Sequence, residues 1–186
     1  MTVESALAAA AEKMEKAIAV LKDELSGVRT GRATPALLQR IVVDYYGTPV
    51  PIQQLASFSV PEPRTLMISP YDRNAISAME KAIMSSDLGI TPGNDGTVIR
   101  LSFPPLTEER RKELIKLVHH RGEEARVSVR NIRRHSKDEL EKLERAGGIS
   151  QDDLLRSERE LQKLTDKHIS EVDEVVAHKD AELKEI

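Results

Sequence analysis

The sequence predicts an α+β protein: an elongated three-helix bundle with an inserted small β/α/β domain. Two observations lead to this fold class. Apolar residues recur at helical spacing over three long segments, and about 75 residues rich in proline and β-favouring side chains separate the first segment from the other two. A long helix with one apolar face is not stable alone, so the first helix must pack against the last two across the inserted segment.

The first predicted helix lies near the N-terminus and ends at Gly31, because glycine is the usual residue at a helix C-terminal cap. Its apolar residues alternate steps of four and three along the chain, which is a heptad pattern. They are Leu7, Ala11, Met14, Ile18, Leu21, Leu25 and Val28. This pattern predicts one apolar seam that packs against the other helices.

The inserted segment is predicted to hold four strands and one helix. Its strands are the β-favouring stretches at residues 39–46, 52–60, 64–69 and 97–103, among which prolines recur. The helix lies between the third and fourth strands, begins at Asp72 or Asn74 and ends at Gly89. Its apolar residues are Ile76, Met79, Ala82 and Ile83. Strands around a single helix make an α+β module.

The second long helix is predicted over residues 106–145, a length on the order of 60 Å. Thr107 can cap its N-terminus, and Glu108 and Glu109 lie in the first turn, where negative charge is favourable. Its core-facing residues are Val118, Ala125, Val129, Ile132 and Leu143. These residues form the apolar seam of the second helix.

The third long helix is predicted to begin after Gly147 and Gly148, which end the second. Ser150 and Asp153 have the spacing of a capping box, and the helix continues to the C-terminus. Its apolar seam is Leu154, Leu161, Leu164, Ile169, Val172, Val175 or Val176, and Leu183.

Two domains follow from this order of elements. The bundle comprises residues 1–30 and 106–186, and the inserted domain comprises residues 31–105. Two short chain connections join them, and they restrict motion more than one flexible linker would. The candidate hinge residues in these connections are Thr30, Gly31, Arg32, Pro104 and Pro105. We expect hinge bending at this position.

The charge of the chain is unevenly distributed. The net charge is only -3, but residues 110–137 hold ten lysines and arginines against three acids, an excess of +7 that leaves -10 on the remaining chain. At about 100° per residue, five side chains of this helix fall within roughly 40° of the direction of His119, at the edge of the core-facing seam, and are predicted to point at solvent. We call them the arginine stripe: His119, Arg126, Arg130, Arg133 and Lys137.

The arginine stripe has two interpretations. A run of charge on a helix is commonly a solvated face, and Glu123 and Glu124 are spaced to pair with some of these arginines. The preference for arginine over lysine instead favours phosphate, which the guanidinium group binds with two hydrogen bonds. Aromatic residues make up only 3% of the chain, which favours structured RNA contacted through its backbone over stacked single strands.

Catalytic and cofactor signals are weak. The chain has no cysteine, and the adjacent His119 and His120 point about 100° apart on a helix, so they cannot share a metal ion. Residues 93–96 (GNDG) precede a strand and lack a following Lys-Ser/Thr, so a turn is predicted there and not a phosphate-binding loop. The sequence therefore predicts no catalytic residue, no metal and no cofactor.

Membrane and export signals are absent from the hydropathy pattern. No apolar run reaches the roughly 20 residues needed to cross a bilayer. The alanine-rich start is interrupted by Glu12 and Lys13, unlike a secretory leader. We therefore expect no membrane partner and a cytoplasmic location.

Several motifs together resemble the ribosome recycling factor family. They are RTGRATPALL at 29–38, IVVDYYGTPVPIQQLASFSV at 41–60, EKAIMSSDLG at 80–89, PPLTEERRKEL at 104–114, ARVSVRNIRR at 125–134 and QKLTD at 162–166. The resemblance implies a three-helix bundle with a β/α/β insert, in an L-shape similar to transfer RNA. It also implies a non-enzymatic protein that binds the post-termination ribosome near the subunit interface. With elongation factor G and GTP hydrolysed by that partner, such a protein separates the ribosome into subunits.

The resemblance also implies which residues bind RNA. The family's contacts with large-subunit ribosomal RNA correspond to Arg111, Arg130 and Arg133, and Arg126 joins them through the stripe. Two other classes of function remain open at this point. One is a structural coiled-coil protein that oligomerises through its heptad seams, whereas we expect a monomer. The other is an RNA-acting hydrolase, which requires a titratable cluster in a cleft.

Overall fold

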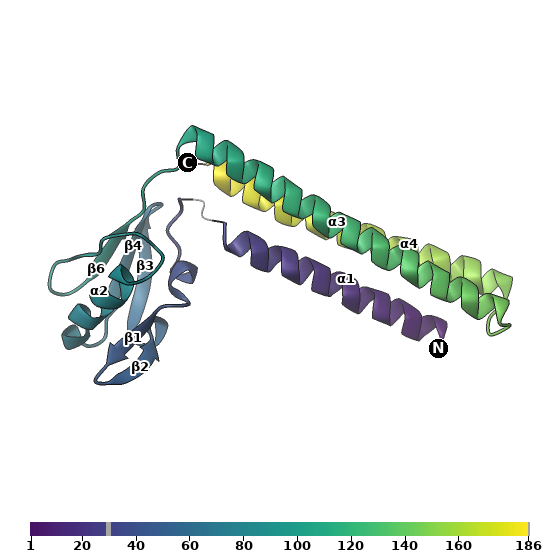
Figure 1. The fold of residues 1–186 in the computed structure, drawn as a ribbon, viewed down its shortest axis with the longest axis horizontal. Helices are drawn as coiled ribbons and strands as arrows, with labels where there is room; N and C mark the ends of the chain where they lie inside the picture. The colour runs from purple at the N-terminus through teal and green to yellow at the C-terminus, as the bar shows by residue number, and fades with distance from the viewer. Residues whose placement is uncertain (29–30, 186) are drawn as a thin grey trace. The chain divides into compact units, whose positions relative to one another are not determined.

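The computed structural model describes residues 1–28 and 31–185, and the chain divides into two compact units (Figure 1). One unit comprises Met1–Arg29 and Glu108–Glu185, and the other comprises Thr30–Thr107. The predicted α+β fold class is confirmed, because three long helices pack as a bundle and the second unit combines short strands with one α-helix.

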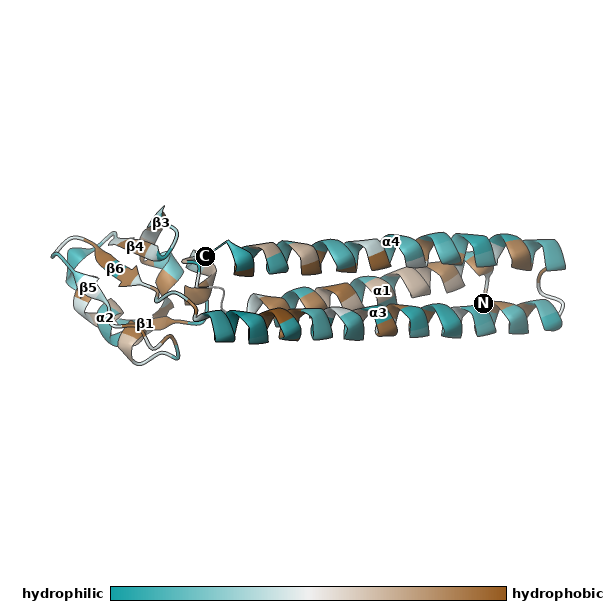
Figure 2. Cartoon of the chain, turned by 90° about the horizontal axis from the view of Figure 1, so that it is seen from above, coloured by the Kyte–Doolittle hydropathy of each residue, from teal (hydrophilic) through white to brown (hydrophobic). Residues whose placement is uncertain are grey.

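The bundle consists of α1 (Val3–Ser26), α3 (Glu108–Arg145) and α4 (Gln151–Lys184). Only residues 146–150 connect α3 to α4, so these two helices run antiparallel, and α1 lies alongside both (Figures 1 and 2). Figure 2 shows that the outer faces of α3 and α4 are mostly hydrophilic. The three helices therefore bury one shared core.

The predicted start and stop signals of the long helices are largely confirmed. Ser150 accepts a hydrogen bond from the Asp153 amide at 3.0 Å, and the Asp153 carboxylate accepts one from the Ser150 amide at 3.4 Å, which completes the capping box. Gly147 adopts the left-handed conformation at φ +77°, as expected after the end of α3. Glu108 and Glu109 lie in the first turn of α3.

The predicted end of α1 at Gly31 is wrong. The helix ends at Ser26 and its C-cap is Gly27. The Ser26 hydroxyl donates a hydrogen bond to the Asp23 carbonyl at 2.6 Å, and the Val28 amide closes a tight turn on the Leu25 carbonyl at 3.1 Å. A serine that competes for backbone groups next to a glycine of low helix propensity ends the helix at this point.

The buried seams differ in part from the predicted ones. Leu7 and Ala11 are only half-buried, because α1 turns Ala6 and Ala10 inward, in steps of four residues. In α3 the predicted Leu143 is likewise half-buried, and Leu140 is fully buried in its place. A steady 3.6-residue period drifts from a strict heptad over such lengths, which shifts the buried face.

Three polar side chains occupy the α4 seam, where apolar periodicity does not find them. Ser157, Thr165 and His168 are 4%, 2% and 2% exposed. Each lies within hydrogen-bonding distance of the backbone carbonyl four residues earlier, at 2.6, 2.8 and 2.8 Å respectively. Because their own helix satisfies them, these groups are buried without an unpaired polar atom. The predicted Leu154, Leu164 and Ile169 pack at the edge of the core.

The second unit contains a hairpin, a four-stranded antiparallel sheet and one α-helix. The hairpin pairs β1 (Val42–Tyr45) with β2 (Thr48–Pro51). The sheet has the order β3-β4-β6-β5, with β3 at Ala56–Glu62, β4 at Thr65–Pro70, β5 at Gly93–Asn94 and β6 at Ile99–Ser102. Its core lies between the strands and α2 (Ile76–Met84).

Several predicted boundaries in this unit change. β2 is an additional strand, formed because Tyr46 and Gly47 both take positive φ values and reverse the chain. Asp72 caps the helical segment as predicted, accepting from the Asn74 amide at 2.9 Å. The predicted end at Gly89 is wrong, since α2 ends at Met84. The GNDG segment contains β5 and the turn into β6, which confirms the turn interpretation.

Both connections of this unit are hydrogen-bonded to the same turn. The Ala33 amide donates to the Pro63 carbonyl at 2.8 Å, and the Phe103 amide donates to the Arg64 carbonyl at 2.8 Å. Residues 63 and 64 form the turn between β3 and β4. The sheet therefore holds the incoming and outgoing chain at one place.

Candidate nucleic-acid interface

The arginine stripe lies on α3, a continuous helix that carries its side chains along one face beside α4. Its first two members reach acids of α4. His119 Nε2 lies 3.4 Å from Asp180 Oδ1, and Arg126 Nη2 lies 2.7 Å from Asp173 Oδ1. Lys184, with a further contribution from His119, holds the pKa of Asp180 below its ordinary value. The near half of the stripe is therefore partly neutralised by the neighbouring helix.

Arg126 is partly enclosed, with 21% of its side chain exposed. Its Nε also donates to Asp173 at 2.8 Å, and Nη1 donates to Glu123 at 3.2 Å. Burial alone would lower the pKa of Arg126, but the hydrogen bonds to Asp173 and Glu123 outweigh it and raise the pKa. This geometry departs from the prediction that the whole stripe points at solvent, and it makes Arg126 a bridge between α3 and α4.

Arg130 is half-exposed, with 52% of its side chain accessible. Among the described residues its side chain has one partner, Glu123, whose Oε1 lies 3.3 Å from Nη1 and which is shared with Arg126. A single long contact at a solvent-exposed site contributes little stability. The guanidinium of Arg130 therefore keeps most of its donors for another anion.

Arg133 differs from the arginines before it. In the described part of the chain its side chain takes part in no ion pair or hydrogen bond. It lies in a groove of about 290 Å³ between α3 and α4, with side chains from both helices. The groove is lined by Arg133, Lys137, Leu155, Glu158, Arg159, Leu161 and Gln162. Lys137 is only loosely paired, at 3.8 Å from Glu141 and 3.9 Å from Glu158.

Arg111 lies apart from these residues. It is half-buried in the first turn of α3. Fifteen residues of helix separate it from Arg126, or about 22 Å. The four predicted RNA-binding arginines are thus spread along α3 and do not form one cluster.

Sequence reasoning missed Arg159 and Gln162, which lie on α4 and face the groove. Arg159 is flanked in sequence by Glu158 and Glu160, so the local charge is balanced and gives no signal. Its place next to Arg133 follows from the register of two antiparallel helices. A helical projection of α4 against the α3 stripe would have been needed to find it.

The predicted hinge residues are only partly described. Thr30 lies outside the described residues. Gly31 takes φ +77°, a conformation that favours glycine, and Arg32, Pro104 and Pro105 are exposed or partly exposed to solvent.

The histidine pair does not form a metal site. His120 Nε2 contacts Glu124 at 2.9 Å, one turn along α3, while His119 contacts Asp180 on α4. Across residues 1–28 and 31–185 no three histidine or acidic side chains gather as metal ligands would. Within the same residues no helix combines the length and apolarity needed to cross a membrane.

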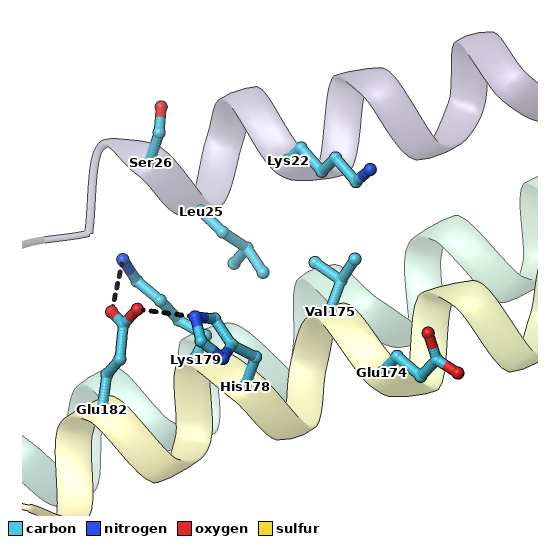
Figure 3. A pocket seen from close by; sticks show the side chains of 8 residues that line it. All are labelled: Lys22, Leu25, Ser26, Glu174, Val175, His178, Lys179 and Glu182. Atoms are coloured by element: carbon cyan, nitrogen blue, oxygen red, sulfur yellow. Dashed lines mark ion pairs between the residues drawn. The ribbon is translucent and has the colours of Figure 1, made fainter. Parts of the chain in front are cut away.

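A separate cavity of about 360 Å³ lies between α1 and α4 (Figure 3). Leu25 and Val175 form its apolar wall, and His178 and Lys179 both pair with Glu182, at 3.1 and 3.4 Å. The Ser26 hydroxyl at its edge is bonded to its own helix. His178 and Lys179 are thus paired with Glu182, and Ser26 is bonded within α1. This arrangement does not place a base next to a nucleophile.

The fold and the stripe define a class of protein: a three-helix bundle with a line of cations along α3 and a small inserted β unit. The family model described as ribosome recycling factor matches residues 21–183, and the chain belongs to this family. Members of this family are translation factors and not enzymes, and this holds for the chain.

Curated relatives cover nearly the whole chain. The ribosome-recycling factor of Acidothermus cellulolyticus is 52% identical over 184 residues, 99% of this chain and 100% of the relative. That of Geobacillus kaustophilus is 56% identical over 177 residues, 95% of this chain and 96% of the relative.

Solved structures of ribosome recycling factors are also similar to this chain. The solution structure of a ribosome recycling factor matches with a TM-score of 0.81 and 46% identity, over 100% of this chain and 99% of the other. A second match, with a TM-score of 0.68 and 45% identity, covers 98% and 99%. It is described as a Thermus thermophilus ribosome recycling factor and Escherichia coli elongation factor G bound to the E. coli post-termination complex.

Proposed function

We propose that this protein binds the post-termination ribosome through large-subunit ribosomal RNA and, with elongation factor G and GTP, promotes its separation into subunits in the cytoplasm. The observation that carries the proposal is the excess of cations at the far half of α3. Arg133 and Arg134 have no side-chain partner among the described residues, and Arg130 has one long contact. A relative bound with elongation factor G to a post-termination complex supports the choice of partners.

The proposed RNA contacts differ in strength along the stripe. Arg130 and Arg133 present guanidinium groups that phosphate can engage with two hydrogen bonds. Arg126 contributes less, because Asp173 and Glu123 already pair with its guanidinium and offset its charge. Arg111 contacts RNA at a second place near the start of α3. Backbone contacts of this kind position a protein on structured RNA without reading its sequence.

The proposed mechanism is mechanical. Residues 1–30 and 106–186 act as a stiff lever held on ribosomal RNA, and residues 31–105 move about the hinge at Thr30, Gly31, Arg32, Pro104 and Pro105. The partner hydrolyses GTP, and no bond is made or broken by this chain. The buried seams of α1, α3 and α4 pack together and make the bundle rigid, since packed helices resist bending better than a single helix.

The same packing favours a monomer over a coiled-coil oligomer. Met14, Leu21 and Leu25 of the α1 heptad pattern are 0%, 1% and 3% exposed within the single chain. A seam that is already covered offers no apolar surface to a second copy. A sedimentation coefficient independent of concentration is the expected result.

The proposal is tested by mixing the purified protein with post-termination ribosomes. Co-sedimentation is expected, and its affinity should fall steeply with added salt. Elongation factor G and GTP should then yield free subunits only when this protein is present. A protein that does not pellet with ribosomes, or subunit release that does not depend on it, would contradict the proposal.

A further inference from the structure

Cross-helix ion pairs repeat along the arginine stripe with a fixed spacing. His119 contacts Asp180, and seven residues later Arg126 contacts Asp173, which lies seven residues earlier on α4. In an antiparallel pair of helices, one heptad forward on α3 corresponds to one heptad back on α4. A third pair at the same spacing would join Arg133 to residue 166.

The third pair is not formed, although residue 166 is an aspartate. The Asp166 carboxylate instead accepts a hydrogen bond from Gln162 Nε2 at 2.8 Å, one turn back along α4. Arg133 takes part in no ion pair with a described residue and lies in the groove with Gln162 and Arg159. The α4 anion that satisfies each earlier member of the series is thus missing at Arg133.

The groove at this place collects cations from both helices. Arg133 and Lys137 come from α3, Arg159 comes from α4, and Glu158 is the one acid among the lining residues. The Arg159 side chain, like that of Arg133, has no ion-pair partner in the described residues. Three cations against one acid leave an excess of about two charges in a groove of about 290 Å³. Such a groove has room for one tetrahedral anion and attracts it.

We propose that this groove holds a single backbone phosphate of ribosomal RNA, gripped by Arg133 from α3 and by Arg159 from α4. The inference rests on the proposed function and adds a second helix to its RNA interface. The phosphate takes the place that an α4 carboxylate takes at Arg126. Gln162 is a positioning residue, because its amide holds the Asp166 carboxylate away from Arg133. RNA and not an acidic protein is the partner, since two guanidinium groups that line one groove can match the oxygens of one phosphate.

The first test measures ribosome affinity as a function of salt for Arg133→Ala, Arg159→Gln and the double variant. Each single variant should bind about tenfold more weakly and lower the salt slope by about one unit. Because both arginines hold the same phosphate, the double variant should bind little more weakly than either single one. Losses that multiply to about a hundredfold would assign the two arginines to separate contacts and overturn the proposal.

Arg156→Gln is the matched control, because Arg156 lies one turn before Arg159 on α4, is 75% exposed and is not part of the groove. It removes the same charge and should change affinity by less than twofold. If Arg156→Gln lowers ribosome affinity as much as Arg159→Gln does, the loss reflects only the overall charge of the protein, and the proposal is overturned. If Arg133→Ala weakens binding and Arg159→Gln does not, the proposed phosphate site in the groove is contradicted, while RNA binding by the arginine stripe is still supported. If no variant of Arg130 or Arg133 weakens binding, the proposed RNA contact itself fails.

A second test fills the groove from within. Gln162→Glu keeps the size of the side chain, adds a carboxylate to the groove that Arg133 and Arg159 line, and removes the donor to Asp166. It should weaken ribosome binding about tenfold, although both arginines remain. Gln151→Glu, eleven residues away on the same helix, adds the same charge and should bind normally. Unchanged affinity of Gln162→Glu would overturn the proposal.

A third test asks whether the occupant is RNA. The chain has no cysteine, so Leu155→Cys at the edge of the groove can carry a tethered iron chelate as the only label. Backbone cleavage of large-subunit RNA is expected from this position and not from Ala9→Cys on α1. Ribosome binding without RNA cleavage from residue 155 would assign the groove to a protein surface and overturn the proposal.

Discussion

Gly122 of α3 lies directly against Val176 of α4. A Cβ atom added at residue 122 would be 2.5 Å from Val176 Cγ2, which is closer than two carbon atoms approach in proteins. Both residues are buried, and Val176 is 4% exposed. The absence of a side chain at residue 122 therefore sets how closely α3 and α4 approach, next to the contact between Arg126 and Asp173.

Gly122→Ala should lower the stability of the bundle. In an open helix the change would be favourable by about 1 kcal/mol, but here the added methyl group must displace a buried β-branched side chain, which costs about 1–3 kcal/mol. We expect a net loss of about 1 kcal/mol, measured as the free energy of unfolding in urea. Val176→Ala in the same chain removes the clashing methyl group, so the double variant should be less destabilised than the two single changes predict. An additive double variant would contradict this account.

Arg126 and Arg133 should separate stability from ribosome binding. Arg126→Gln leaves Asp173 without its cation and Glu123 with Arg130 alone, and should lower the unfolding free energy by about 1 kcal/mol, with a smaller effect on ribosome affinity. Arg133→Ala removes no internal ion pair and should leave the melting temperature unchanged while it weakens ribosome binding. Thermal melts and co-sedimentation of both variants measure this. Weaker ribosome binding by Arg126→Gln together with normal binding by Arg133→Ala would show that Arg126, and not Arg133, faces the RNA.

Asp95 should make the β unit sensitive to acid. Its carboxylate accepts hydrogen bonds from the Val98 and Thr97 amides and the Thr97 hydroxyl, which lower the pKa of Asp95 from 3.8 to about 2. Because the folded state favours the ionised form, this stabilisation is complete above about pH 4 and is lost as the pH falls toward 2. The unfolding free energy of the wild type minus that of Asp95→Asn should therefore decrease over this range. A difference that stays constant from pH 5 to pH 2 would contradict the prediction.

Local chemistry explains what could be predicted from the sequence. The Ser150 capping box, the Asp72 cap and the glycine after α3 each depend on residues within four positions of one another, and all three are present as predicted. The exact buried residues depend on how helices pack. The exchange of Leu7 for Ala6 in the core, and the burial of His168, follow from the α1 and α4 contacts and leave no local signal.

In the candidate site, too, some features follow from one helix alone and others depend on how two helices pack. The alignment of Arg130 and Arg133 is a property of one helix, so projection of α3 was enough to predict it. The neutralisation of Arg126 by Asp173, and the meeting of Arg133 with Arg159, depend on the register of α3 against α4. That register is set by the five-residue connection and by small residues such as Gly122. The pattern of charges in the sequence gives no information on it.

Hydrogen exchange should locate the boundary of the hinge. The Ala33 and Phe103 amides are bonded to the carbonyls of Pro63 and Arg64, so both ends of the β unit are fixed to one turn of its sheet. Their exchange should be as slow as that of the neighbouring strand amides, which are protected by the sheet. The Leu106 amide, which has no hydrogen bond to a described residue, should exchange orders of magnitude faster. Exchange at Phe103 as fast as at Leu106 would place the hinge inside the sheet and contradict the assignment to Pro104 and Pro105. Pro63→Ala keeps the carbonyl and serves as the control, since it should leave the protection of Ala33 unchanged.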